Sequence, residues 1–131
     1  MTGENIRANV DEELAAAHEA LDAAAANEKI GQLKTAVNRL YYAAYHAGLA
    51  VCLSEGIEPK THRGLSHLLQ LHFVKPGKLP GWVQSELSVL QTNRDLADYE
   101  PGYRVSVDDY QRLRATTDRL ISELEAFLKP S

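Results

Sequence analysis

The segment over residues 32–54 carries apolar side chains on nearly every side of a helix, and this feature constrains the fold more than any other. One stripe, at steps of three and four residues, consists of Leu33, Val37, Leu40, Ala44, Ala47 and Val51. A second stripe ends at Leu53 and a third ends at Cys52. Because a helix of this kind has to be covered on most sides, we expect it in the centre of the domain, ended by Gly56.

Glycine and proline residues separate four other segments with helical spacing of apolar residues. These segments are about residues 10–27, 63–74, 80–100 and 106–128. Asn9 with Glu12, and Ser106 with Asp109, have the spacing of capping boxes at helix starts. No segment of useful length alternates like a strand. We therefore expect an all-α fold, an antiparallel bundle of four long helices and one short helix.

The composition narrows the class of protein. The chain has 131 residues, which fits one domain over 1–131 with a core over about 10–128. Its 14 basic and 18 acidic residues give a net charge of −4, so bulk charge does not favour nucleic-acid binding. The single cysteine, Cys52, excludes an internal disulfide. The N-terminus is polar, and the longest charge-free run, residues 40–54, is shorter than the ~20 residues of a membrane span. We expect a cytoplasmic protein that does not associate with membranes.

Arg94 is the most informative single residue. It lies on the apolar stripe of the fourth expected helix, between Leu90 and Ala97. An unpaired buried charge is costly, so Arg94 needs a partner, and Asp98 lies one turn later. Two interpretations follow: a salt bridge that tethers the helix to its neighbour, or an arginine at a cleft or dimer seam that meets a phosphate.

Arg39, Tyr42 and His46 form a second constellation, because steps of three and four residues place them on one helical face. They are either core residues whose polar tips find partners, or a polar seam with a cation and a base. An arginine and a histidine in a partly dry site suit metal-independent RNA cleavage, since the histidine moves protons near neutral pH and the arginine stabilises the phosphate.

The sequence carries no strong signature of a metal site or of a common catalytic motif. His62, His67 and His72 are spaced by five residues, which does not put them on one helix face. We expect no metal and no cofactor.

Four short motifs occur in an order that is typical of one family. They are RLYYAAYHA at residues 39–47, KTHRGL at 60–65, FVKPGKL at 73–79 and NRDLADY at 93–99. They resemble the RAYYAxFHA signature, the KTHxG turn, the short linker and the R-x-x-A-D-Y helix ending of HEPN domains, the higher eukaryote and prokaryote nucleotide-binding family. The resemblance covers about residues 10–128.

This resemblance implies a helical bundle that usually forms a homodimer. Small HEPN proteins are often encoded beside a minimal nucleotidyltransferase, and many such pairs act as toxin–antitoxin modules. In the ribonuclease branch, an R-x4-6-H motif meets its symmetry mate across the dimer seam and cuts RNA without metal. The nucleotidyltransferase can silence the toxin by modifying a tyrosine beside that motif.

The chain departs from the ribonuclease pattern after Arg94, because no histidine follows it. Asp98 and Tyr99 stand where the histidine would be expected, and an aspartate is a poor proton donor at neutral pH. The R-x6-H string from Arg39 to His46 belongs to the helix-two signature. We expect a catalytically quiet partner module that binds a nucleotide or RNA at Arg94, rather than an enzyme.

Two alternatives stay open. One is an active metal-independent ribonuclease toxin that uses Arg94, with His46 or Tyr99 supplying the proton chemistry. The other is a helical scaffold for protein interaction, in which the stripe of the last helix binds a partner.

Tyr99, between Asp98 and Glu100 at a helix end, has two interpretations as well. An exposed hydroxyl could accept a nucleotidyl group from the partner enzyme. Alternatively, the ring packs on the next helix and its hydroxyl binds a carboxylate.

Overall fold

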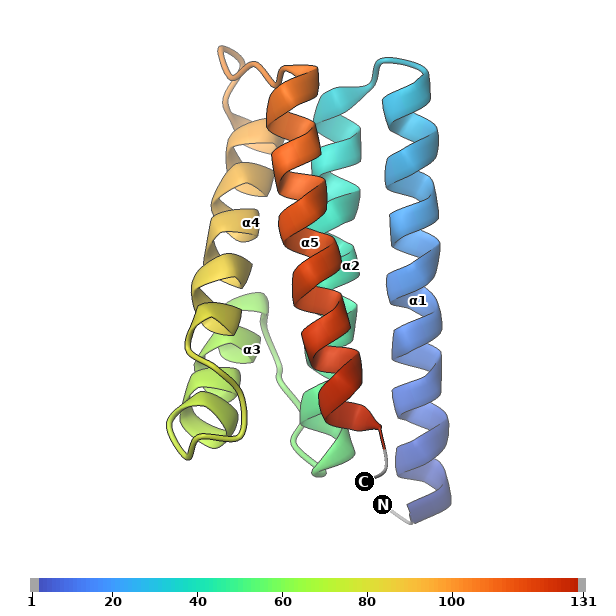
Figure 1. The fold of residues 1–131 in the computed structure, drawn as a ribbon, viewed down its shortest axis with the longest axis vertical. Helices are drawn as coiled ribbons and strands as arrows, with labels where there is room; N and C mark the ends of the chain where they lie inside the picture. The colour runs from blue at the N-terminus through green and yellow to red at the C-terminus, as the bar shows by residue number, and fades with distance from the viewer. Residues whose placement is uncertain (1–2, 130–131) are drawn as a thin grey trace.

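The computed structural model describes residues 3–129, and the long helices in that range run up, down, up and down (Figure 1). The helices are α1 (Gly3–Lys29), α2 (Leu33–Ser54), α3 (His62–Leu69), α4 (Trp82–Tyr99) and α5 (Val107–Leu128). A π-helical turn, η1 (Gln70–Val74), continues α3. The expectation of an all-α antiparallel bundle of four long helices and one short helix is confirmed.

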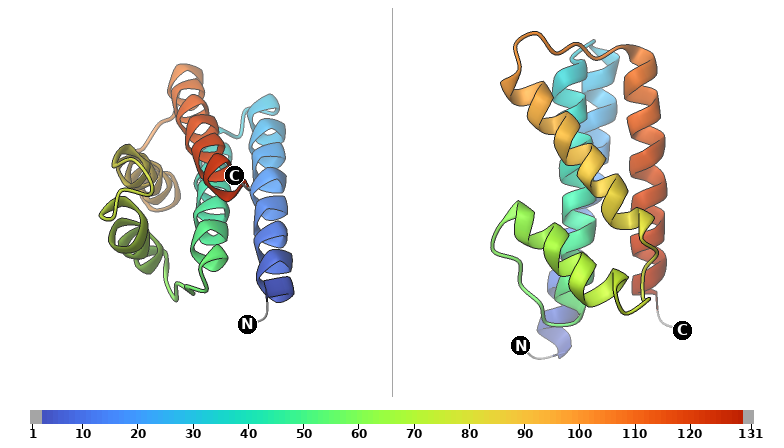
Figure 2. Two further views of the ribbon diagram at one scale, coloured as in Figure 1. Left: turned by 60° about the horizontal axis from the view of Figure 1, so that its bottom comes forward. Right: turned by 90° about the vertical axis from the view of Figure 1, so that its left-hand side faces the viewer.

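Helix α2 is the centre of the bundle, as its apolar stripes predicted. It packs against α1, α4 and α5, and α3 lies across its lower end. Figure 2 shows α4 crossing α2 at an angle, with α5 beside it. Val37, Leu40 and Val51 of α2 are fully buried, and the surrounding core takes side chains from α1, α3, η1, α4 and α5. The helix that α4 crosses, α2, also carries the tyrosine-rich motif at residues 39–47.

The start of α1 corrects one prediction. The helix begins at Gly3, so Asn9 lies inside it and does not cap it. Residues 3–9 are mostly exposed and give no apolar stripe, yet Ile6 and Val10 line a hollow with Leu128 of α5. Periodicity alone therefore does not indicate this first part of α1. Helix α4 also begins slightly later than expected, since Gly81 occupies its N-cap and Pro80 precedes it.

The capping box of α5 is confirmed. The Ser106 hydroxyl accepts a hydrogen bond from the Asp109 amide at 3.0 Å, and the Asp109 carboxylate accepts one from the Ser106 amide at 3.1 Å. The box fixes where the chain turns from the loop after α4 into α5. In the part of the chain that the structure describes, no helix combines the length and apolarity of a membrane span.

Replacing Ser106 with Ala should lower the free energy of unfolding by about 1 kcal/mol, because the Asp109 amide in the first turn of α5 loses its acceptor. Urea denaturation monitored by circular dichroism measures this loss. Ser88, exposed in the middle of α4, gives the matched control, and Ser88→Ala should leave stability unchanged or slightly higher. Equal stabilities for the two variants would contradict the role of the box.

Candidate functional site

Arg94 lies in the seam between α4 and α2, and its side chain is only 15% exposed. Its guanidinium carbon lies 5.3 Å from the centre of the Tyr41 ring and 5.7 Å from that of Tyr42. Its Nη1 donates a hydrogen bond to the Tyr42 hydroxyl at 3.0 Å. Both tyrosines belong to α2, so one cation joins the two helices through ring faces and a hydroxyl.

Two carboxylates of α4 accompany this cation. Asp95 Oδ1 accepts from both Nε and Nη2 of Arg94, at 3.2 and 2.9 Å. Asp98, the partner expected from helical spacing, is farther away, with Oδ2 3.8 Å from Nε. Asp98 instead accepts a hydrogen bond from the amide of Asn38 on α2 at 3.1 Å. Arg94 thus ties α4 to α2 through the Tyr42 hydroxyl, whereas its ion pairs with Asp95 and Asp98 stay within α4.

Arg39 brings a second cation to the same seam. Its guanidinium carbon lies 4.9 Å from the centre of the Tyr42 ring. Its Nε and Nη2 donate to the side-chain oxygen of Asn38 at 3.0 and 2.7 Å. Arg39, Tyr42 and Arg94 therefore form one connected group, in which one phenol ring has a guanidinium near it from each helix.

His46 is engaged elsewhere. Its Nδ1 lies 2.6 Å from Glu13 Oε2 of α1, so the imidazole faces the α1 side of α2. Its ring contacts Tyr45 edge-on at 5.4 Å. The constellation of Arg39, Tyr42 and His46 is thus divided, with Tyr42 held by α4 and His46 held by α1.

His62 is the site residue that the sequence reasoning missed. It is the first residue of α3, where the Thr61 hydroxyl caps the helix by accepting from the Gly64 amide at 2.8 Å. A Cβ on residue 64 would lie 2.9 Å from that hydroxyl oxygen, so glycine lets the turn close. The turn presents the His62 ring to α2, where it stacks on Tyr45 at 4.3 Å and its Nδ1 lies 2.7 Å from the Tyr41 hydroxyl.

The electrostatics of this cluster keep His62 neutral. Burial lowers the pKa of His62, and the nearby Arg94 cation lowers it further, against a smaller opposing effect of Asp95. Burial also raises the pKa of the Tyr41 phenol, which stays protonated. The seam therefore holds a permanent guanidinium beside an imidazole whose neutral form is favoured. Helical periodicity could not reveal this pairing because His62 is only the first residue of the short helix α3; the only signal was the KTHRGL string itself.

Tyr99 ends α4 with a side chain that is 72% exposed. It does not pack on the next helix as one interpretation had it. Val89 and Leu96 are 45% and 36% exposed. Because Leu96 follows Val89 by seven residues and Tyr99 follows Leu96 by three, all three residues lie on the same outer side of α4. Helix α4 thus has a partly apolar outer face on the side away from Arg94, which points inward to α2.

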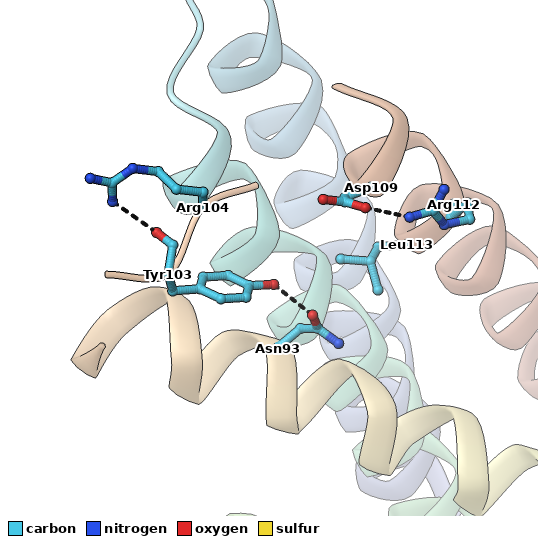
Figure 3. A pocket seen from close by; sticks show the side chains of 6 residues that line it. All are labelled: Asn93, Tyr103, Arg104, Asp109, Arg112 and Leu113. Carbon is cyan, nitrogen blue, oxygen red and sulfur yellow. Dashed lines mark hydrogen bonds and ion pairs between the residues drawn. The ribbon is translucent and has the colours of Figure 1, made fainter. Parts of the chain in front are cut away.

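One hollow, of about 350 Å³, lies outside this seam, where α4 leads into α5 (Figure 3). Its charged and polar lining groups are engaged with one another: Arg112 pairs with Asp109, and the Tyr103 hydroxyl donates to Asn93 at 2.6 Å. Arg104 donates to the backbone carbonyl of Pro101 at 3.0 Å. Because these groups are exposed or satisfied, we place the candidate site at the Arg94 seam, where a charge is held out of water. No group of three or more metal-type side chains comes together within residues 3–129.

The imidazole of His62 should titrate below its usual pKa of 6.5, and Arg94→Gln should raise that pKa because a nearby positive charge is lost. Since the folded pKa is depressed, the stability that His62 contributes is present above pH 6.5 and is lost as the pH falls through the folded pKa. An NMR titration of the ring protons measures the shift. Arg112→Gln removes the same charge from the distant hollow and should leave the His62 pKa unchanged, whereas equal effects of the two variants would contradict the contact.

Comparison with known proteins adds three relatives. A UPF0332 protein of Pyrococcus horikoshii is 40% identical over 47 residues, 36% of this chain and 33% of that protein. A UPF0332 protein of Thermotoga maritima is 32% identical over 83 residues, 63% of each chain. A Methanocaldococcus jannaschii protein named "Putative toxin MJ0605" is 31% identical over 77 residues, 59% of this chain and 58% of that protein. The chain aligns with less than two thirds of the length of each relative.

The HEPN domain family matches residues 10–127. Three of the four motifs that resemble this family supply the seam: the first gives Tyr41 and Tyr42, the second gives His62 and the fourth gives Arg94. Because the match spans most of the chain and its motifs build the candidate site, this chain belongs to the HEPN domain family.

Proposed function

We propose that this chain is a dimeric HEPN module that binds a phosphate of a nucleotide or RNA at Arg94. In this proposal it works with a nucleotidyltransferase partner in a toxin–antitoxin-type system and does not cut RNA itself. The observation that carries the proposal is the Arg94 guanidinium, which two tyrosine rings and the Tyr42 hydroxyl hold in one position. The toxin name of the Methanocaldococcus relative supports the class of system.

A guanidinium held in this way suits phosphate binding. Its Nη1 points to Tyr42, which leaves the Nε and Nη2 edge, the edge that carboxylates and phosphates take, facing Asp95. Since α2 and α4 fix the side chain before any ligand arrives, little rotamer entropy is lost on binding. Arg39, whose guanidinium also lies near the Tyr42 ring, adds a second cation for an extended ligand such as RNA.

The absence of ribonuclease activity rests on the group one turn after Arg94. Asp98 stands there, and its carboxylate accepts a hydrogen bond from Asn38. An ionised aspartate cannot give a proton to the leaving group of an RNA cleavage, and His46 is held by Glu13 away from Arg94. The residues of this seam are therefore better suited to holding a phosphodiester than to cutting it.

One observation favours metal-independent RNA cleavage as a second candidate. Neutral His62 contacts Tyr41, over whose ring Arg94 lies, so an imidazole and a guanidinium share one neighbour. A neutral imidazole is the form that accepts a proton from an attacking hydroxyl. In this reading His62 replaces the histidine that the motif lacks.

The outer face of α4 supports a dimer. Val89, Leu96 and Tyr99 leave a partly apolar surface on the side of α4 away from Arg94, and burying such a surface favours association. In a two-fold dimer built on this face, the two copies of α4 would pack against each other.

Arg94→Gln should abolish binding of a fluorescent RNA oligonucleotide and of AMP, since the fixed cation is lost. Fluorescence anisotropy and calorimetry, in the presence of EDTA, measure the affinities, and a gel of the same samples reports cleavage. The matched control Arg112→Gln should bind like the wild type; loss of binding in this control alone would move the site to the hollow of Figure 3.

Cleavage of RNA by wild type in EDTA, abolished in both Arg94→Gln and His62→Ala, would establish the second candidate. Binding that neither variant changes would favour a protein-interaction scaffold.

Co-expression with the neighbouring genes should recover a complex with a nucleotidyltransferase, and intact mass should show a nucleotide-sized addition on this chain. Tyr99 is the expected acceptor because it is exposed at the C-terminal end of α4. Tyr99→Phe should abolish the addition. Tyr103→Phe is the control, because the Tyr103 hydroxyl is engaged by Asn93 and should not be the acceptor. An unchanged adduct on Tyr99→Phe, or a monomer without any partner, would contradict this part of the proposal.

A further inference from the structure

The outward edge of Arg94 is covered by a carboxylate from the adjacent residue. Asp95 Oδ1 takes both Nε and Nη2, and no other hydrogen bond or ion pair of Asp95 occurs within residues 3–129. Residues i and i+1 of a helix point in directions about 100° apart, so they do not normally face each other. The contact exists because the tyrosines of α2 hold the guanidinium sideways, with its free edge turned toward Asp95.

Asp95 is held more loosely than the other carboxylate of the site. Its side chain is 49% exposed, and a single oxygen serves both donors, in place of the two-oxygen fork that an arginine prefers. Asp98 is 29% exposed and its two oxygens accept from Asn38 of α2. Of the two, Asp95 is the carboxylate that can rotate into water at small cost, since half-exposed ion pairs contribute little to stability.

We infer that Asp95 is an internal substitute for the ligand phosphate: it neutralises Arg94 in the free protein and is displaced when a nucleotide or RNA phosphate takes the Nε and Nη2 edge. This inference rests on the proposed function, because it concerns the same cation. It places the phosphate on one defined edge of Arg94, where two phosphate oxygens form the fork that a single Asp95 oxygen does not.

The arrangement also selects among phosphate ligands. Inorganic phosphate has to replace a carboxylate that is already in place, and it makes few other contacts. A nucleotide or RNA gains further contacts with groups such as Arg39 and the half-buried ring of Tyr42, which offset the displacement. The free protein meanwhile avoids an unpaired cation in the seam, which would be costly.

Asp95→Asn should tighten binding of AMP and of the RNA oligonucleotide by about three- to tenfold, because the competing charge is lost while Arg94 keeps its tyrosine contacts. The matched control is Asp98→Asn, which removes the same charge one turn away. Asp98→Asn should change the affinity by less than about twofold, the effect of losing one screened surface charge. Asp98 accepts its hydrogen bonds from Asn38, whereas Asp95 takes the Nε and Nη2 edge of Arg94. In the double variant Arg94→Gln with Asp95→Asn, the tighter binding of AMP and RNA should be lost, because the cation that binds the phosphate is gone.

The outcomes separate the inference from the proposed function. If wild type and Asp95→Asn bind equally while Arg94→Gln does not bind, the inference is wrong and the proposed function stands. Equal tightening in Asp95→Asn and Asp98→Asn would also overturn it, since that result reports only general charge. If neither wild type nor Asp95→Asn binds either probe, the proposed function fails and the inference fails with it.

A measurement on the unaltered protein covers the case in which Asp95→Asn folds poorly. In an NMR titration with AMP, the side-chain carboxyl carbon of Asp95 and the Nε–H of Arg94 should shift together as the phosphate replaces the carboxylate. A shift of Arg94 with no change at Asp95 would overturn the displacement.

Discussion

The hydrogen bond from Arg94 to the Tyr42 hydroxyl is the interaction on which the rest of the site depends. A guanidinium between two helices remains charged, so the seam has to supply partners for it. The tyrosines of α2 supply ring faces and one hydroxyl, and the carboxylates of α4 supply the counter-charge. The same tyrosine-rich turn of α2 receives His62 from α3. Three helices therefore meet at one cluster of aromatic rings, and the cation fixes how α4 crosses α2.

The fold could be predicted from the sequence because its signals are local or periodic. The stripes of residues 32–54 indicated a helix buried on most sides, and α2 is that helix. The capping box at Ser106 was visible because both partners lie within one turn. The start of α1 was not predictable in this way, since residues 3–9 are mostly exposed and leave no apolar stripe.

The site was only partly predictable, for a related reason. Helical spacing indicated that Arg94 needs a partner and suggested Asp98, four residues later. The nearest carboxylate is instead Asp95, because the direction of the Arg94 side chain is set by tyrosines on another helix. His62 was missed because its contacts, Tyr41 and Tyr45, lie 17 to 21 residues earlier in the chain, beyond any local rule. The family motifs contained all of these residues, yet the pairing between motifs follows only from the packing of α3 and α4 on α2.

The charge balance of the seam limits how the proposed phosphate ligand could be attracted to it. The whole chain has a net charge of −4, and within the seam Arg39 and Arg94 are matched by Asp95 and Asp98. Long-range attraction of a phosphate is therefore weak, and affinity has to come from an exchange at short range. A fixed guanidinium allows such an exchange because its position does not change when one anion replaces another.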